Sequence, residues 1–183
     1  MKIKSVVDIC KKSGFMYLIT MEDGTQWLGD GVAYYPLIQA PEFSEDSLYS
    51  TFDITEKEAE GIIFRKEELP DGFNFSNDAN EELFAERNEI LISYRGKDYC
   101  VYHAPEGALY INSKYLKPIE KDKTEVYIRR TPKGTPYFVY KVGFMVQAIV
   151  APLSFNSGHK DFFENLSLLY KDTKKKMEGI VNV

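Results

Sequence analysis

Apolar positions first recur at helical spacing and then alternate as in strands. Residues 3–13 carry an apolar stripe at positions i, i+3, i+4 and i+7 and end before Gly14, which predicts an amphipathic helix. Three strand-like runs follow within residues 15–37. Asp23-Gly24 separates the first two, and this dipeptide favours a tight hairpin because glycine readily adopts positive φ. The first unit is therefore predicted to be a helix followed by a three-stranded antiparallel meander.

The same order returns in the second half of the chain. Residues 89–111 contain three strand-like runs, and residues 113–117 are predicted to form a short helix that Pro118 limits. Three further strands are expected within residues 124–151, separated by turns that contain proline and glycine. A helix-plus-meander unit is thus predicted twice, without residue-by-residue repetition.

The segment between the two units, residues 39–88, has a different pattern and is predicted to be an acidic helical insertion. Thr55 and Glu58 have the spacing of a capping box, which predicts a short helix over 55–64. Another short helix is expected after Asn77. The buried contacts expected for it are Leu83 and Phe84.

The C-terminal tail, residues 156–183, is predicted to be helical because residues 159–176 are amphipathic. Its apolar side is formed by Phe162, Phe163, Leu166, Leu169 and Tyr170. We expect this side to dock on the domain or on a partner protein. The predicted fold class is α+β, with one domain over 1–155 that contains the insertion, followed by the tail.

Composition agrees with a packed globule. Hydrophobic residues make up 44% and aromatic residues 14% of the 183 residues, enough for a core without a disulfide or a metal ion. The N-terminus lacks the apolar run of a signal peptide, and no apolar run approaches the roughly 20 residues of a membrane span. A cytoplasmic protein without membrane contact is therefore expected, with Cys10 and Cys100 reduced and buried.

Charge is distributed unevenly along the chain. Residues 36–90 hold fifteen acidic side chains against four basic ones, a local net charge of −11, whereas residues 91–183 have a local net charge of +6. Such separation suits a surface that faces a polyanion, with an acidic outer side. Ordinary solvated surfaces give the same separation, and the sequence leaves both interpretations open.

Residues 89–155, about a third of the chain, contain an ordered series of strand and helix patterns. A strand runs into a small polar residue and a helix that opens with Tyr-Leu, and later strands lie beside prolines. The segments concerned are 109–116, 125–129, 135–139 and 149–153. In pattern and order they resemble the last part of a bacterial DNA sliding clamp, the ring-forming processivity factor of DNA polymerases.

The resemblance implies a DNA-clamp-like single lobe, in which both helices line a DNA-facing surface and the sheets lie outside. It further implies phosphate contacts from the lysines of these helices. They are Lys4, Lys11, Lys12, Lys114 and Lys117. Double-stranded DNA and replication proteins would be the partners. Clamp chains usually hold two or three lobes, whereas this chain has room for one. Self-association into a homo-oligomer is therefore one option. The divergence and small size of the chain suggest a phage or a mobile element as its source.

No complete catalytic motif is present, and we expect a protein that is not an enzyme and needs no cofactor. His103 and His159 are the only histidines, and neither has further metal ligands at short spacing, so no metal site is expected. Strand alternation puts Cys100 and His103 on opposite faces, which argues against a nucleophilic pair. The alternative to DNA binding is a protein-interaction module that uses the acidic segment or the tail helix.

Overall fold

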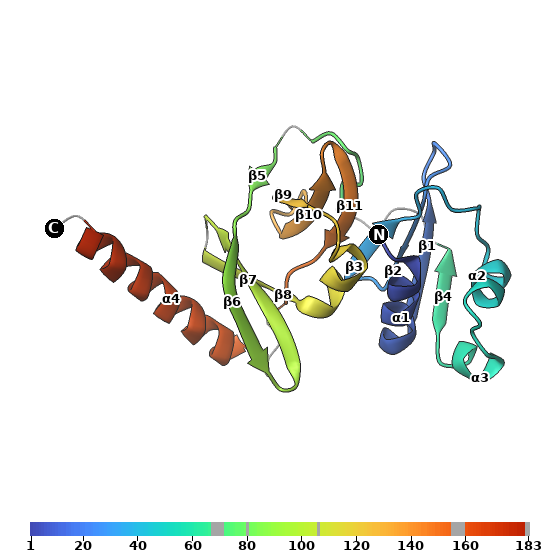
Figure 1. The fold of residues 1–183 in the computed structure, drawn as a ribbon, viewed down its shortest axis with the longest axis horizontal. Helices are drawn as coiled ribbons and strands as arrows, with labels where there is room; N and C mark the ends of the chain where they lie inside the picture. The colour runs from blue at the N-terminus through green and yellow to red at the C-terminus, as the bar shows by residue number, and fades with distance from the viewer. Residues whose placement is uncertain (67–71, 80, 106, 155–159, 182–183) are drawn as a thin grey trace.

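The computed structural model describes residues 1–66, 72–79, 81–105, 107–154 and 160–181. Two mainly antiparallel sheets, the helices that pack on the larger sheet, two short helices of the insertion and a projecting C-terminal helix make up this α+β fold (Figure 1). The elements are α1 (Ile3–Ser13), β1 (Phe15–Thr20), β2 (Gln26–Gly29), β3 (Ala33–Pro36), α2 (Glu45–Thr51), α3 (Glu56–Ala59), β4 (Ile63–Lys66), β5 (Leu83–Phe84), β6 (Arg87–Tyr94), β7 (Lys97–Ala104), β8 (Gly107–Asn112), the 3₁₀ helix η1 (Ser113–Ile119), β9 (Glu125–Arg130), β10 (Pro136–Val142), β11 (Met145–Val150) and α4 (Lys160–Val181).

The larger sheet has eight strands in the order β4-β1-β2-β3-β11-β10-β9-β5. It contains both predicted meanders, β1-β2-β3 and β9-β10-β11, which join where Tyr34 of β3 pairs with Ile149 of β11. The hairpin between β1 and β2 turns at Gly24, whose φ of 82° is the conformation expected there. The strands β6, β7 and β8 form a second, three-stranded sheet. The prediction of two antiparallel meanders is confirmed.

Helices α1 and η1 lie side by side on one face of the larger sheet. Val6, Val7 and Cys10 of α1 are buried in the same core as Tyr115 and Ile119 of η1. The apolar stripe read from the sequence is therefore the buried face of α1. The second helix was predicted to be limited by Pro118, but η1 includes Pro118 and ends at Ile119. Proline's fixed φ is compatible with helical backbone, so Pro118 does not end η1.

The opposite face of the larger sheet is also covered. Trp27, Tyr34 and Tyr137 are buried there, and Phe73 and Phe75 of the segment 72–79 pack against them. The Phe75 ring stands edge-on to the Trp27 ring at a centroid distance of 4.8 Å. Because both faces are covered, β2 and β3 are buried at every position, including the polar Gln26.

The insertion contributes a strand that the sequence analysis assigned to a helix. The capping box of Thr55 and Glu58 is present, but α3 ends at Ala59 rather than near residue 64. β4 then pairs in parallel with β1 and forms the edge of the larger sheet. Pairing with β1 gives these residues tertiary contacts that the local helix signal does not reveal, and tertiary context overrides local propensity here.

The prediction of a helix after Asn77 is wrong. Leu83 and Phe84 instead form the edge strand β5 beside β9, and Phe84 is 67% exposed rather than buried. The reason is an ionic contact that no apolar pattern indicates. The Glu82 carboxylate binds Arg129 of β9 and Lys141 of β10, and this holds the chain along the sheet edge.

The predicted C-terminal helix is present as α4. Only its first turns dock, with Phe163 fully buried among Tyr99, Val101 and Tyr110 of the three-stranded sheet. The rest of α4 extends away from the body of the molecule (Figure 1). Within the ranges given above, no helix combines the length and the apolar composition needed to cross a membrane.

Candidate nucleic-acid interface

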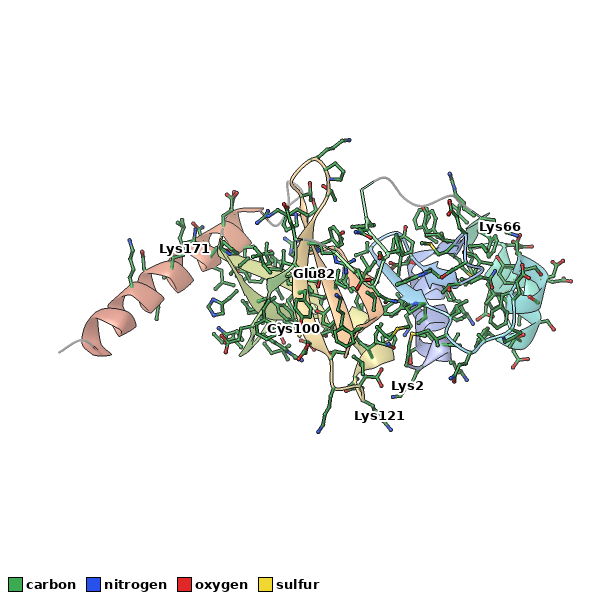
Figure 2. The ribbon with its side chains drawn as sticks, turned by 90° about the horizontal axis from the view of Figure 1, so that it is seen from above. Lys2, Lys66, Glu82, Cys100, Lys121 and Lys171 are labelled. Atoms are coloured by element: carbon green, nitrogen blue, oxygen red, sulfur yellow. The ribbon has the colours of Figure 1, made fainter. Side chains whose placement is uncertain are left out.

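The helix pair presents a lysine-rich surface. The lysines of α1 and η1, together with the lysines directly before α1 and shortly after η1, form a surface that we call the helix face. These lysines are Lys2, Lys4, Lys11, Lys12, Lys114, Lys117 and Lys121. Figure 2 shows Lys2 and Lys121 on the same side of the molecule, although 119 positions separate them in the sequence. The same segments contain three carboxylates, Asp8, Glu120 and Asp122, so the helix face is net basic.

A backbone hydrogen bond fixes the relative position of the two helices. The Lys2 amide donates to the Pro118 carbonyl oxygen at 2.8 Å, so the start of α1 lies against the end of η1. The Tyr35 hydroxyl, buried beneath them, donates to the Tyr115 carbonyl oxygen at 2.6 Å and ties η1 to the sheet. The helix face is therefore held by buried contacts rather than by its own exposed side chains.

Asp30 forms a buried polar centre beneath η1. One of its carboxylate oxygens accepts hydrogen bonds from the amides of Val32 and Ala33, and the other accepts from the Tyr115 hydroxyl at 3.1 Å. Burial, and then the Asp30 charge, raise the pKa of Tyr115, which keeps this hydroxyl protonated as a donor. The Gly29-Asp30-Gly31 segment before β3 thus also anchors the second helix.

Two of the five predicted phosphate contacts are committed to carboxylates. The Lys114 amine lies 3.6 Å from Asp30 and over the Tyr115 ring. The Lys11 amine lies 2.7 Å from Glu58 of α3, and a hydrogen bond from Lys11 is the first cause of the lowered pKa of Glu58. An amine that is already neutralised contributes less to phosphate binding.

The other three predicted lysines are exposed and available. Lys4, Lys12 and Lys117 have no ion-pair partner in the described ranges. Lys2 and Lys121 are likewise exposed, and the sequence analysis missed them. The available signal was their position directly before the first helix and directly after the second one.

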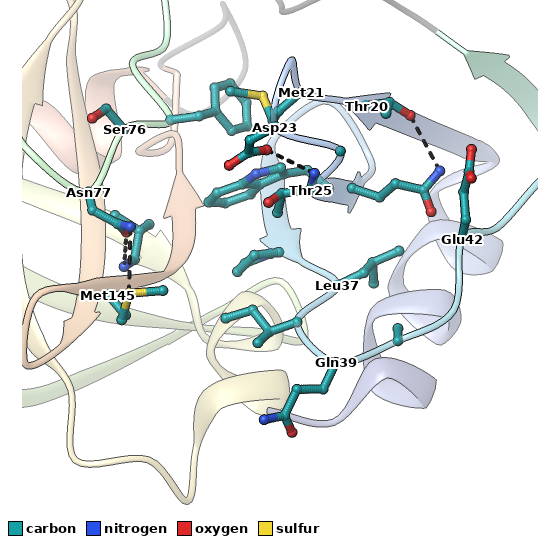
Figure 3. A pocket seen from close by; sticks show the side chains of 18 of the residues that line it. Thr20, Met21, Asp23, Thr25, Leu37, Gln39, Glu42, Ser76, Asn77 and Met145 are labelled. Atoms are coloured by element: carbon teal, nitrogen blue, oxygen red, sulfur yellow. Dashed lines mark hydrogen bonds between the residues drawn. The ribbon is translucent and has the colours of Figure 1, made fainter.

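A groove of about 710 Å³ lies on the opposite face of the larger sheet (Figure 3). Three carboxylates line it, from Asp23, Glu42 and Asp78, and none of its lining residues is basic. Its polar groups are largely engaged in holding loops, since Gln26 bonds the Phe43 backbone in both directions and Asn77 accepts from the Val146 amide. This groove repels polyanions and does not bring catalytic groups together.

The other candidate residues for chemistry are separated. Both thiols are free and buried, and burial is the first cause of the raised pKa of Cys100. The Cys100 sulfur accepts from Arg87 at 3.1 Å, whereas the His103 ring lies 3.5 Å from the Asn88 amide nitrogen. Within the described part of the chain, no three His, Cys, Asp or Glu residues are grouped as a metal site. His159 lies outside the described residues.

The predicted partner-binding side of the tail is partly buried against the domain and partly exposed. Phe163 is buried in the chain's own core, Phe162 stacks on Tyr94 at 4.3 Å, and Leu166 is half-buried. Leu169 is 63% exposed. The side chain of Tyr170 lies outside what the structure describes. The first turns of this side therefore hold α4 to the domain, and only the later part is open to a partner.

Comparison with protein-family models, with curated proteins and with solved structures gives no significant match. The candidate function therefore has to be argued from the geometry of this chain alone.

Proposed function

We propose that this chain binds double-stranded DNA without sequence specificity through the helix face. The observation that carries the proposal is the direct contact between α1 and η1, which brings lysines from both halves of the chain onto one surface. The acidic helices α2 and α3 lie at one end of the long axis, beyond α1 (Figure 1). This separation of charge favours one orientation of the protein on a polyanion.

The contacts expected are diffuse. Lysine amines neutralise backbone phosphates and release condensed counterions, and they read no base edges. Such contacts let a protein slide, because moving along the duplex breaks no base-specific bond. A clamp-like role beside replication proteins is the form of this function that the sequence resemblance suggests, and encirclement of DNA would require several copies of this single-lobed chain.

Charge reversal on the helix face tests the proposal. In fluorescence anisotropy at about 50 mM salt, the triple variant Lys4→Glu/Lys12→Glu/Lys117→Glu should bind labelled duplexes at least about tenfold more weakly than the wild type. The matched control is Lys57→Glu/Lys66→Glu/Lys133→Glu, which changes the net charge equally at exposed lysines outside the helix face. The control should lose less than about threefold. Equal losses in both variants would contradict a defined binding face.

Protein interaction through α4 is a second candidate, favoured by the exposure of Leu168 and Leu169 on the projecting part of this helix. The variant Leu168→Ser/Leu169→Ser removes this surface and leaves Phe163 anchored. A partner retained by the wild-type protein in a pull-down and lost with this variant would support the candidate. Identical sets of captured proteins would contradict it.

A further inference from the structure

A second pocket, of about 470 Å³, lies beside η1. It is bounded by η1 and the turn that follows it, and by β7, β9 and β10. Leu116, Ile119 and Val126 supply apolar wall. Its polar and charged lining residues are Arg87, Tyr102, Ser113, Lys117, Glu120, Asp122, Lys123, Thr124 and Tyr140.

The two tyrosine hydroxyls leave one hydrogen-bond donor unused. Tyr140 donates to the Tyr102 oxygen at 3.0 Å, and both residues are at most 2% exposed. In the described ranges, the Tyr102 hydrogen has no acceptor. A buried hydroxyl without an acceptor is unfavourable, and such groups commonly face a ligand or an ordered water molecule. Burial raises the pKa of Tyr102 even though Arg87 opposes the shift, so the hydroxyl is a donor at neutral pH.

Three cations line the same pocket as this donor. Arg87 donates one N–H to the Cys100 sulfur, a weak acceptor, and it has no carboxylate partner among the described residues. Lys117 and Lys123 are exposed, and neither has an ion pair within these ranges. Two carboxylates also line the pocket. They are Glu120 and Asp122, and Asp122 is paired with the Met1 ammonium at 3.1 Å.

We propose that this pocket binds a phosphate group, with the Tyr102 hydroxyl as the buried donor and the exposed side chains of Arg87, Lys117 and Lys123 at the rim. An anion is favoured because three cations and the Tyr102 donor line the pocket, against the two carboxylates of Glu120 and Asp122, of which Asp122 is paired with the Met1 ammonium. Phosphate fits better than a single carboxylate, because its oxygens diverge and can accept from a guanidinium, a hydroxyl and ammonium groups that approach from different directions. The pocket is separate from the helix face except for Lys117, which borders both.

The phosphate could belong to a free nucleotide or to the end of a nucleic-acid strand. Calorimetric titration with inorganic phosphate, with adenosine monophosphate and with a 5′-phosphorylated duplex distinguishes these sources. Saturable binding of the monophosphate that exceeds binding of the duplex end assigns a free nucleotide, and the reverse order assigns a strand terminus. No saturable binding of any of the three at low ionic strength overturns the proposal.

A pair of single-atom substitutions tests the assignment of the donor. Tyr102→Phe removes the hydroxyl that faces the pocket and should weaken phosphate binding about tenfold or more, as expected for a lost hydrogen bond to a charged group. Tyr140→Phe is the matched control, since it removes the neighbouring hydroxyl and leaves the Tyr102 donor in place. Its affinity should stay within about twofold of the wild type. Equal losses in the two variants would overturn the role of Tyr102.

Two further variants test the pocket even if Tyr102→Phe does not fold, and they separate phosphate binding from duplex binding. Arg87→Gln changes an exposed side chain and should weaken phosphate binding at least about tenfold, so the proposal can be refuted even if Tyr102→Phe fails to fold. Lys4→Glu/Lys12→Glu should weaken duplex binding and leave binding of inorganic phosphate unchanged. Failure of the helix-face proposal and failure of the pocket proposal are therefore distinguishable.

Discussion

The Tyr115 hydroxyl donates a 3.1 Å hydrogen bond to Asp30, across 85 positions of sequence, and so joins the second helix to a turn of the first meander. We expect Tyr115→Phe to lower the free energy of unfolding by about 1–3 kcal/mol, because it removes a hydrogen bond from a buried carboxylate. Urea denaturation measures this loss. Tyr127→Phe, which breaks an exposed bond to Glu125, is the matched control and should cost less than about 0.5 kcal/mol. Equal costs would contradict the anchoring role of Asp30.

The contact of Glu82 with two buried cations predicts a large effect from a small change. Arg129 is 2% exposed and Lys141 is buried, and both bind the Glu82 carboxylate. Glu82→Gln should therefore lower the free energy of unfolding by about 3–5 kcal/mol, because it leaves two buried positive charges without a counterion. Glu81→Gln, at the exposed neighbouring position, should have little effect in the same denaturation experiment. A loss below about 1 kcal/mol for Glu82→Gln would contradict the account.

The same carboxylate predicts acid sensitivity. Burial alone would raise the pKa of Glu82, but hydrogen bonds from Lys141 and Arg129 and the charges of both lower it below its ordinary 4.5. A group whose pKa is lowered on folding stabilises the protein above its unfolded pKa, and this contribution is lost as the pH falls through the folded value. Stability should thus decline below about pH 4.5 in the wild type. The decline should be shallower in Glu82→Gln, and parallel pH profiles for the two proteins would exclude Glu82 as its source.

Glycine is required at position 29 because neighbouring atoms leave no room for a Cβ atom, and not because of its φ angle. A Cβ atom there would lie 2.1 Å from the Ala33 carbonyl oxygen and 2.6 Å from the Tyr34 ring. Gly29→Ala should therefore lower the thermal midpoint strongly, with a cost of about 1–3 kcal/mol or more from overpacking. Gly61→Ala, whose Cβ would meet nothing closer than 3.4 Å, should leave the midpoint nearly unchanged. A tolerated Gly29→Ala would mean that the turn before β3 can rearrange.

The docking of α4 depends on one aromatic side chain. Phe163 is fully buried against Tyr99 and Tyr110, whereas Leu169 of the same helix is exposed. Phe163→Ala should detach the helix and reduce the hydrogen-exchange protection of its amides, because truncating a buried phenylalanine costs about 3–5 kcal/mol. Leu169→Ala should preserve the protection. Unchanged exchange in Phe163→Ala would show that other contacts hold α4.

Local patterning was sufficient to predict the parts of the fold that depend on short-range periodicity. The stripe of Val6, Val7 and Cys10 specified the buried face of α1, and the Asp23-Gly24 turn specified the first hairpin. The β5 strand was missed because Glu82 meets Arg129 and Lys141 only after folding. A contact between distant charges leaves no periodic signal in the sequence.

The sequence predicted which lysines lie on the two helices, but it did not predict which of them pair with carboxylates. Lysine positions on a helix can be read from the sequence, and Lys4, Lys12 and Lys117 are exposed as that pattern suggests. The pairing of Lys11 with Glu58 and of Lys114 with Asp30 depends on how the insertion and the turn fold back onto the helices. The Tyr102–Tyr140 pair joins the two sheets and likewise has no local signature.

The salt dependence of duplex binding tests the central claim most directly. With three to five phosphate contacts from the unpaired lysines of the helix face, the logarithm of the association constant should fall with the logarithm of salt concentration at a slope of about −3 to −5. Two duplexes of unrelated sequence should give the same slope, and Lys4→Glu/Lys12→Glu/Lys117→Glu should reduce its magnitude by about three. No binding at about 25 mM salt, or affinity that does not change with salt, would contradict the account.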